Sequence, residues 1–132
     1  MTKCLQYNFP YIKGRPLITA KLTYKKKSRY FEFLVDSGAV FTFISKSYAL
    51  LLGIDASKPS LKKKIIKVEV ANLTFIKAYK IKLQITIKDE SLKIQVLVAD
   101  REVECLLGRK GVFDYFDILF QENKQQMLLI KH

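Results

Sequence analysis

The sequence of 132 residues predicts an all-β domain with one or two short helices. The first observation is that apolar and polar residues alternate in most segments, which is the period of a strand with one buried face. The second is that helical spacing of apolar residues is confined to two short stretches. The third is that Gly (5) and Pro (3) are scarce while 49% of residues are hydrophobic, so no segment has the composition of a linker. We therefore expect a single domain over residues 1–132.

The strands follow from this alternation in chain order. They are predicted over residues 17–24, 30–35, 65–70, 75–87, 92–98, 103–107, 117–120 and 126–130. Residues 25–29 and 88–91 are polar and predict the turns of two hairpins.

The helical signals are short. Ser45 is a good N-cap for a helix over residues 46–52, which Gly53 would end. A second short helix is predicted over residues 110–115, before the strand that begins at 117.

The net charge of +12 has two interpretations. Lysine clusters at residues 25–27 and 62–64, in a chain rich in Tyr and Phe, are compatible with binding to nucleic acid. The lysines also alternate with apolar residues, as in Ile81-Lys82-Leu83, which is typical of a solvated strand face, and lysines at hairpin tips protect sheet edges. We favour solvation because no groove-reading helix or RNA-binding signature accompanies the charge. Nucleic-acid binding stays open as the weaker alternative.

The cysteines and apolar runs bear on the compartment. Cys4 and Cys105 form no Cys-x-x-Cys pair, and we expect both to be free thiols in a reducing environment. Residues 1–15 contain no signal-peptide core, and the longest apolar run, residues 48–52, is too short to cross a bilayer. These features predict a soluble, cytoplasmic protein without a membrane partner.

Asp36 is the residue best placed for chemistry. It follows the apolar run Phe33-Leu34-Val35 and precedes Ser37 and Gly38, so a carboxylate stands at the edge of a core in a tight turn. Asp-Ser-Gly is also an ordinary turn sequence, because Asp accepts hydrogen bonds from its own backbone and Gly tolerates positive φ. The tripeptide alone does not decide between the two interpretations.

Two motifs together favour the catalytic interpretation of Asp36, because they resemble a known family. Residues 34–39 (Leu-Val-Asp-Ser-Gly-Ala) are followed by Thr42-Phe43-Ile44-Ser45, and residues 106–109 (Leu-Leu-Gly-Arg) by a short helix and residues 116–118. This combination resembles the retropepsin-type aspartic proteases, and the likeness extends from Arg15 to Phe120. It implies a closed, barrel-like β domain with a flap hairpin.

The resemblance also implies a mechanism and a partner. Amide hydrolysis needs one ionised carboxylate to deprotonate water and one protonated carboxylic acid to donate a proton. This chain has one such motif, and in the retropepsin family an identical subunit supplies the second. The resemblance therefore implies a homodimeric aspartic endopeptidase in which Asp36 meets its copy across a two-fold axis, acts on unfolded or extended polypeptide, and needs no cofactor or metal.

Further roles are implied for the neighbouring residues. The Ser37 hydroxyl would form a hydrogen bond across the dimer axis, Gly38 would permit close backbone approach, and Ala39 would keep the pocket wall small. Gly108 would lie against the catalytic loop where no side chain fits, and Arg109 is similar to the family's buried structural arginine.

The sequence departs from the family at its ion pairs. Val40 stands where the retroviral enzymes have an acidic residue, so their ion-pair network is not carried over to Arg15 and Arg109. Asp114 and Asp117 are the candidate partners for Arg109.

Two further departures concern the flap and the C-terminus. The flap tip, Ala71, Asn72 and Leu73, contains no glycine, which predicts a stiffer or differently shaped hairpin. Residues 121–132 extend beyond the family's helix, and we expect residues 127–130 to be buried between subunits.

Other chemistry is poorly supported. His132 is the only histidine and lies at the chain end, so no Cys/His pair is indicated, and the acidic stretches 89–90 and 100–104 suit solvated turns. Residues 108–111 do not have the glycine spacing of a phosphate loop. Two alternatives to the protease stay open: a retropepsin-fold dimeric peptide-binding module with little or no proteolysis, and a basic nucleic-acid-binding β-protein in which Asp36 only caps a turn.

Overall fold

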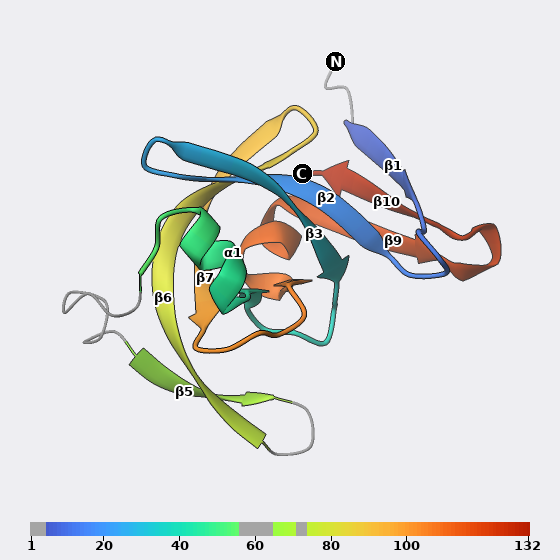
Figure 1. The fold of residues 1–132 in the computed structure, drawn as a ribbon. Coiled ribbons are helices and arrows are strands. Elements are labelled where there is room, and N and C mark those ends of the chain that lie inside the picture. Colours follow the sequence, from blue (N-terminus) through green and yellow to red (C-terminus); the bar gives the residue numbers. More distant parts are fainter. Residues whose placement is uncertain (1–4, 56–64, 71–73) are drawn as a thin grey trace.

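The chain folds into a closed β-structure with a small additional sheet in the computed structural model, which describes residues 5–55, 65–70 and 74–132 (Figure 1). The described strands are β1 (Gln6–Pro10), β2 (Leu17–Tyr24), β3 (Lys27–Val35), β4 (Thr42–Ile44), β5 (Ile65–Val70), β6 (Thr74–Ile87), β7 (Glu90–Ala99), β8 (Leu106–Leu107), β9 (Phe116–Gln121) and β10 (Gln126–Lys131). The described helical segments are α1 (Lys46–Leu51), η2 (Arg109–Phe113) and η3 (Glu122–Lys124).

The main sheet closes on itself. Its strand order is β2-β3-β8-β4-β7-β6-β5, and β2 also pairs with β6, as in the pair of Leu22 with Ile85. The strands from β2 to β6 in this order therefore form a ring, and β5 lies outside it. Most neighbours are antiparallel, but β8 is parallel to β3 and β4 is parallel to β7. The predicted all-β class and barrel-like closure are confirmed.

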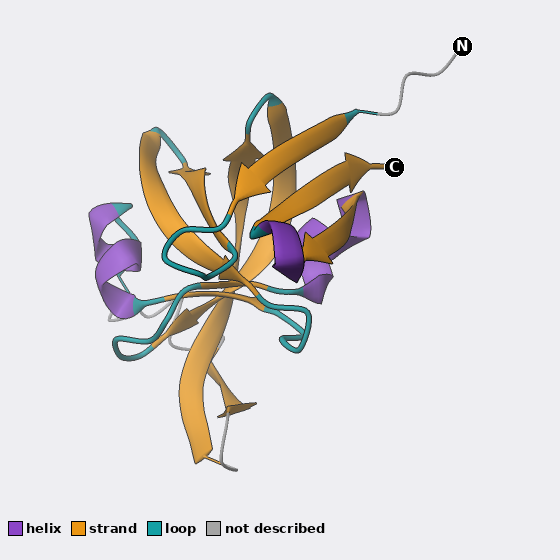
Figure 2. Ribbon diagram, turned by 90° about the vertical axis from the view of Figure 1, so that its right-hand side faces the viewer, coloured by secondary structure: helices purple, strands orange, loops and turns teal. Residues whose placement is uncertain are grey.

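The β5–β6 hairpin extends away from the ring (Figures 1 and 2). Its register pairs Ile65 with Tyr79 and Val70 with Thr74, as expected for the flap hairpin of the sequence prediction. The proposed flap tip, Ala71, Asn72 and Leu73, lies outside the described residues. Cys4 and the lysine cluster 62–64 also lie outside them.

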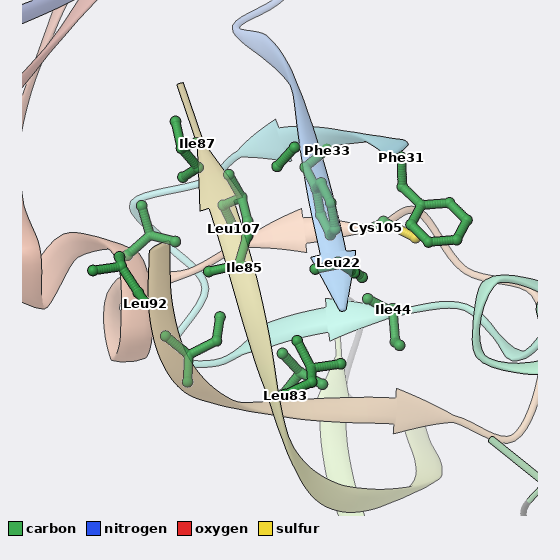
Figure 3. Packing of buried hydrophobic residues seen from close by; sticks show 14 of the residues in the cluster. Leu22, Phe31, Phe33, Ile44, Leu83, Ile85, Ile87, Leu92, Cys105 and Leu107 are labelled. Atoms are coloured by element: carbon green, nitrogen blue, oxygen red, sulfur yellow. The ribbon is translucent and has the colours of Figure 1, made fainter. Parts of the chain in front are cut away.

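The interior of the ring holds the main core (Figure 3). It is formed by side chains that alternate inward from β2, β3, β6 and β7, which is the period-two burial that the sequence predicts. Its fully buried large side chains include Leu22, Phe33, Ile44, Ile85, Ile87 and Leu107. Burial of apolar surface of this kind is the dominant stabilising contribution to such a fold.

A second apolar cluster lies on the other face of β6 and β7. Its buried members are Phe43, Ile76, Ala78, Leu97 and Ala99, and half-buried Phe41, Ile66, Val68, Val70, Val103 and Leu106 pack against them. Strand β4 joins the two clusters, since Phe43 belongs to the second cluster and Ile44 to the main core.

The C-terminal segment forms a sheet within its own chain. Strands β1, β10 and β9 form an antiparallel sheet within one chain, with β10 in the centre. Met127 and Leu129 are buried in the chain's own main core. The expectation that residues 127–130 are buried between subunits is therefore wrong for these two, because the strand turns one apolar face inward.

Helix α1 agrees with its prediction, and the second predicted helix is present only in part. The Ser45 hydroxyl accepts a hydrogen bond from the Tyr48 N–H at 3.5 Å, and Gly53 follows the helix with φ +78°. The predicted helix over residues 110–115 falls on η2 and the two helical residues after it, but Lys110 and Gly111 have non-helical backbone angles (Gly111 φ +106°), so the helical turn begins only after Gly111. Among the described residues, no helix has the length and apolar character needed to cross a membrane.

Candidate active site

Asp36 lies where strand β3 leaves the ring. Val35 is buried at 3% exposure, Asp36 is half-buried, and Ser37 and Gly38 are exposed. The Asp36 N–H donates to the Leu107 carbonyl at 3.0 Å, which continues the parallel pairing of β3 with β8 by one residue. The backbone under the carboxylate is thus part of the sheet, while the carboxylate itself stands at the surface.

The turn after Asp36 orients its carboxylate. The Gly38 N–H donates to Asp36 Oδ1 at 2.9 Å, and the Ala39 N–H donates to the Asp36 carbonyl at 3.2 Å. The turn interpretation of Asp-Ser-Gly is therefore correct as local structure. It is compatible with catalysis, because a carboxylate fixed through one oxygen is already positioned for a reaction through the other.

Gly108 packs directly beneath the loop of residues 36–41, which we call the Asp36 loop. A Cβ at Gly108 would collide with the Phe41 carbonyl oxygen and stand 2.6 Å from the Phe41 carbonyl carbon and 2.9 Å from the Ala39 carbonyl oxygen. Because these contacts are backbone atoms, no rotation of a side chain relieves them. The close approach predicted for Gly108 is present at this point.

Thr42 belongs to the sequence motif quoted above, but the sequence interpretation gave it no role in the site. Its side chain is buried at 0% exposure, and its Oγ1 accepts from the Gly108 N–H at 3.2 Å and donates to the Lys110 carbonyl at 3.3 Å. The Arg109 and Lys110 N–H groups donate to the Ala39 and Val40 carbonyls at 2.9 and 2.8 Å. The sequence feature that points to this role is a single hydroxyl side chain in the otherwise apolar stretch from Ala39 to Ile44.

The arginines differ from what the resemblance implied. The Arg109 side chain is exposed in the chain, and its contribution to the Asp36 loop is its main-chain N–H. Arg15 forms an exposed ion pair with Glu104 at 2.7 Å.

Neither candidate partner of Arg109 forms an ion pair with it. Asp114 Oδ2 accepts from the Gly111 N–H at 3.1 Å, and Asp117 Oδ1 lies 2.7 Å from His132 Nε2. The Asp114 carboxylate thus binds a main-chain N–H, and the Asp117 carboxylate contacts the C-terminal histidine.

Cys105 has a structural role in the neighbourhood of the site. The Ser45 N–H donates to its Sγ at 3.3 Å, and burial raises the pKa of the thiol above its usual range. A buried neutral thiol is a poor nucleophile. Among the described residues, no group of three or more His, Cys, Asp or Glu side chains is arranged to hold a metal ion.

The second apolar cluster adjoins the Asp36 loop. Phe41 belongs to that loop and packs against the cluster, as does Leu106 of β8, which pairs with Leu34 just before Asp36. On the opposite side the cluster is contacted by Val68 and Val70 of the β5–β6 hairpin. A carboxylate, a half-open apolar surface and a projecting hairpin are therefore brought together.

A closed β ring, a projecting hairpin and a carboxylate loop on a glycine-packed strand define the retropepsin-like aspartic proteases, and comparison with solved structures agrees. A retropepsin-like aspartic protease from Rickettsia conorii superimposes with a TM-score of 0.72 at 22% identity, covering 99% of this chain and 94% of that one. The EIAV protease complexed with the inhibitor HBY-793 gives 0.50 at 18% identity, covering 74% and 85%.

The family follows from the sequence profile. The profile of the aspartyl protease family matches residues 20–110, a span that contains Asp36 and Gly108. The chain belongs to the aspartyl protease family. No curated protein matches the sequence.

Proposed function

We propose that this protein is an aspartic endopeptidase that is active as a homodimer, with Asp36 of each subunit forming the catalytic dyad. The observation that carries the proposal is the position of Asp36: a half-buried carboxylate on a turn fixed from below by Gly108, within the span that the family profile matches. Fold and family support an aspartic protease, and the dyad and the dimer are the finer part of the proposal.

The proposal needs two copies because the chemistry needs two carboxyl groups. The Asp-Ser-Gly motif occurs once in the sequence, and Asp36 is the only acidic residue of the Asp36 loop. Two such loops related by a two-fold axis bring equivalent carboxylates together. Like charges held so close share one proton, as the two aspartates of pepsin do.

The shared proton gives each Asp36 a role in the reaction. The ionised carboxylate removes a proton from water, whose oxygen attacks the scissile carbonyl carbon, and the protonated carboxyl donates its proton to the carbonyl oxygen. The carboxyl group that took the proton from water then donates it to the leaving nitrogen, the other carboxylate takes a proton from a hydroxyl of the tetrahedral diol, and the C–N bond breaks to release the amine. The dyad returns to one proton, and no metal or cofactor takes part.

The exposed residues of the loop suit contact with a second copy. Ser37 is exposed, and its hydroxyl makes no hydrogen bond with the described residues. We assign it a hydrogen bond across the axis, with Gly38 and Ala39 leaving space for substrate.

The substrate fits as an extended polypeptide. Half-buried Val68, Val70, Val103 and Leu106 expose part of their apolar surface around the second cluster, where substrate side chains would bind. A projecting hairpin offers backbone groups to a strand-like peptide, which is the usual mode of extended peptide recognition.

The test compares Asp36→Asn with the matched variant Asp89→Asn, which changes an exposed turn carboxylate. Both are incubated with an unfolded protein substrate between acidic and neutral pH, with and without a pepstatin-like inhibitor. We expect Asp36→Asn to lose activity by about 10³-fold with unchanged thermal stability, and Asp89→Asn to match the wild type. Proteolysis that persists in Asp36→Asn would contradict the assignment. A folded dimer that cleaves nothing at any pH would favour the peptide-binding module.

A further inference from the structure

A row of lysines continues the face of the sheet that carries the second apolar cluster. Along β6 and β7 the residues that face the main core are apolar, whereas the opposite face carries Lys80, Lys82 and Lys93. The register sets Lys82 opposite Gln95 and Lys93 opposite Gln84, so the lysines are neighbours across the two strands. Lys80 pairs with Leu97, a buried member of the second cluster. Apolar cluster and lysines are thus successive parts of one surface.

Two more lysines extend this row at its ends. Lys110 Nζ stands 5.2 Å and Lys80 Nζ 5.7 Å from the centroid of the Phe41 ring. At the other end, Tyr24 at the end of β2 and Lys25 of the β2–β3 turn line a hollow of about 400 Å³ together with Lys82 and Lys93. We call the set Lys25, Lys80, Lys82, Lys93 and Lys110 the lysine stripe.

The charge of the lysine stripe is uncompensated. The ion pairs formed by the described residues involve Arg15, Arg101, Lys131 and His132, and none involves a lysine of the stripe. One carboxylate, Asp114, lines a second hollow together with Lys93 and Lys110, and it already accepts a hydrogen bond from the Gly111 N–H. Closely spaced lysines without partners raise the local positive potential and attract an anionic ligand.

We propose that the lysine stripe binds an acidic segment of the substrate polypeptide next to the scissile bond. This inference rests on the proposed protease function and adds a substrate class to it. Phe41 carries the argument, because it lies on the Asp36 loop, packs against the second cluster and contacts two lysines of the stripe. An extended chain that leaves the apolar cluster along this face reaches the lysines.

The spacing of the stripe suits an extended acidic peptide. Lys80 and Lys82 are two residues apart on one strand face, or about 7 Å. Carboxylates at alternate positions of an extended peptide have the same spacing. Charged groups on such a surface set substrate preference and association rate more than overall affinity.

The aromatic residues argue for a peptide over a nucleic acid. Non-specific binding of single strands relies on open aromatic faces on which bases stack. The Phe41 ring is contacted by Lys80 and Lys110, and the Tyr24 ring by Lys25 at 5.4 Å. The Phe41 and Tyr24 rings are therefore engaged by the chain's own ammonium groups, and Tyr115, which lines a hollow with Lys93 and Lys110, is the one exposed ring beside the stripe among the described residues that has no such contact.

The test uses two peptides with one cleavable apolar core, flanked either by alternating Glu or by alternating Gln. The stripe variant is Lys82→Gln/Lys93→Gln/Lys110→Gln. The matched control, Arg29→Gln/Lys46→Gln/Lys124→Gln, loses the same charge at exposed positions outside the stripe. At low salt we expect kcat/KM of the wild type and of the control to be about tenfold higher for the Glu peptide than for the Gln peptide. In the stripe variant we expect this ratio to be about twofold. The preference should vanish near 1 M salt, where the screening length falls to about 3 Å.

A binding measurement separates this inference from the proposed function. Fluorescence anisotropy of the labelled Glu peptide on Asp36→Asn, with and without the stripe substitutions, reports binding without cleavage. Stripe-dependent binding to Asp36→Asn, together with a wild type that cleaves neither peptide, would support the stripe and refute the protease. Equal preference in wild type and stripe variant would overturn the stripe while the protease stands. Stripe-dependent binding of an oligothymidylate but not of the Glu peptide would also overturn it.

Discussion

The main core and the region around Asp36 are built by different means. The main core consists of apolar side chains such as Phe33, Ile85 and Leu107 that are completely removed from solvent. The Asp36 loop is held instead by close backbone contacts and hydrogen bonds, from Gly108, Thr42 and the main chain of Arg109. Stability therefore depends mainly on side-chain burial, and the position of the carboxylate depends on backbone packing.

The two apolar clusters differ in how completely they are enclosed. The main core is enclosed by the ring, while the second cluster is bordered by half-buried side chains from the β5–β6 hairpin and β8. Strands β6 and β7 contribute to both, because alternate residues face opposite sides. One pair of strands thus supplies structure on one face and a candidate binding surface on the other.

The largest effect should come from the enclosed cluster. Ile85→Ala removes a fully buried side chain and should lower the free energy of unfolding by about 3 kcal/mol, because transfer energy is lost and a cavity is left. Val68→Ala, at a half-buried position beside the second cluster, should cost less than about 1 kcal/mol but raise KM. Urea unfolding measures the free energy of unfolding of both variants, and steady-state kinetics measures KM. Similar stability losses for both variants would contradict the division between the clusters.

Substitution of Gly108 should reduce stability less than Ile85→Ala does and should reduce catalytic activity more. Gly108→Ala forces Cβ against the Phe41 and Ala39 carbonyl groups, so the Asp36 loop must shift. We expect the free energy of unfolding to fall by about 2 kcal/mol and kcat to fall by at least about 100-fold. Gly38→Ala is the matched variant, since its Cβ would meet only Asp36 Oδ1, at 3.2 Å. It should leave the unfolding midpoint nearly unchanged. A Gly108→Ala protein with wild-type kcat would show that the backbone contact does not position the carboxylate.

Several elements of the fold were predictable because their sequence patterns are local. The strand over 17–24 and the strand over 65–70 match β2 and β5 at both ends, and the Ser45 cap begins α1 as expected. Each depends on period-two alternation or on one capping hydroxyl, which a short stretch of sequence contains.

The rest depends on contacts between distant residues. Strand β4 has three residues and exists because Thr42–Ile44 pair with β7 and β8. The predicted strand over 103–107 shortens to Leu106–Leu107, since Glu102 accepts hydrogen bonds from Ser47 and Glu104 pairs with Arg15. Strand β1 was missed altogether, because it is short, contains Pro10 and forms only by pairing with β10.

The places of Asp36 and Gly108 in the fold were predictable, the contacts that hold the Asp36 loop were not, and the catalytic role of Asp36 stays a prediction. Asp36 and Gly108 follow from apolar runs that end in Asp-Ser-Gly and Gly-Arg, and the structure places Gly108 under the Asp36 loop. Thr42 and the exposure of Arg109 were not predictable, because both depend on which backbone groups the loop brings within reach. The roles of Ser37, Gly38 and Ala39 stay predictions.

The smallest effect should come from the contact between the terminal sheet and the ring. Lys131 Nζ lies 2.9 Å from Glu90 Oε2, and the Tyr7 hydroxyl donates to Glu90 Oε1 at 3.2 Å. The hydrogen bond from Lys131 holds the pKa of Glu90 below its ordinary value of 4.5. The folded state then binds fewer protons than the unfolded state, so this contribution to stability is present above pH 4.5 and is lost as pH falls through the lowered pKa.

Glu90→Gln should therefore lower Tm slightly near pH 7 and have less effect near pH 3. Asp89→Asn, one residue away in the exposed turn, serves as the control. A difference in Tm between wild type and Glu90→Gln that does not change with pH would exclude the ionised contact.

The most direct test of the Asp36 dyad is a subunit-mixing measurement. Wild type at fixed concentration is exchanged with a growing excess of Asp36→Asn or, as control, Asp89→Asn, and proteolysis per wild-type chain is measured. If each active site uses Asp36 from two chains, activity per wild-type chain should fall toward zero as Asp36→Asn captures wild-type subunits in mixed dimers, and Asp89→Asn should cause no fall. Activity per wild-type chain that is independent of added Asp36→Asn, under conditions where mixed dimers are detected, would contradict the shared dyad.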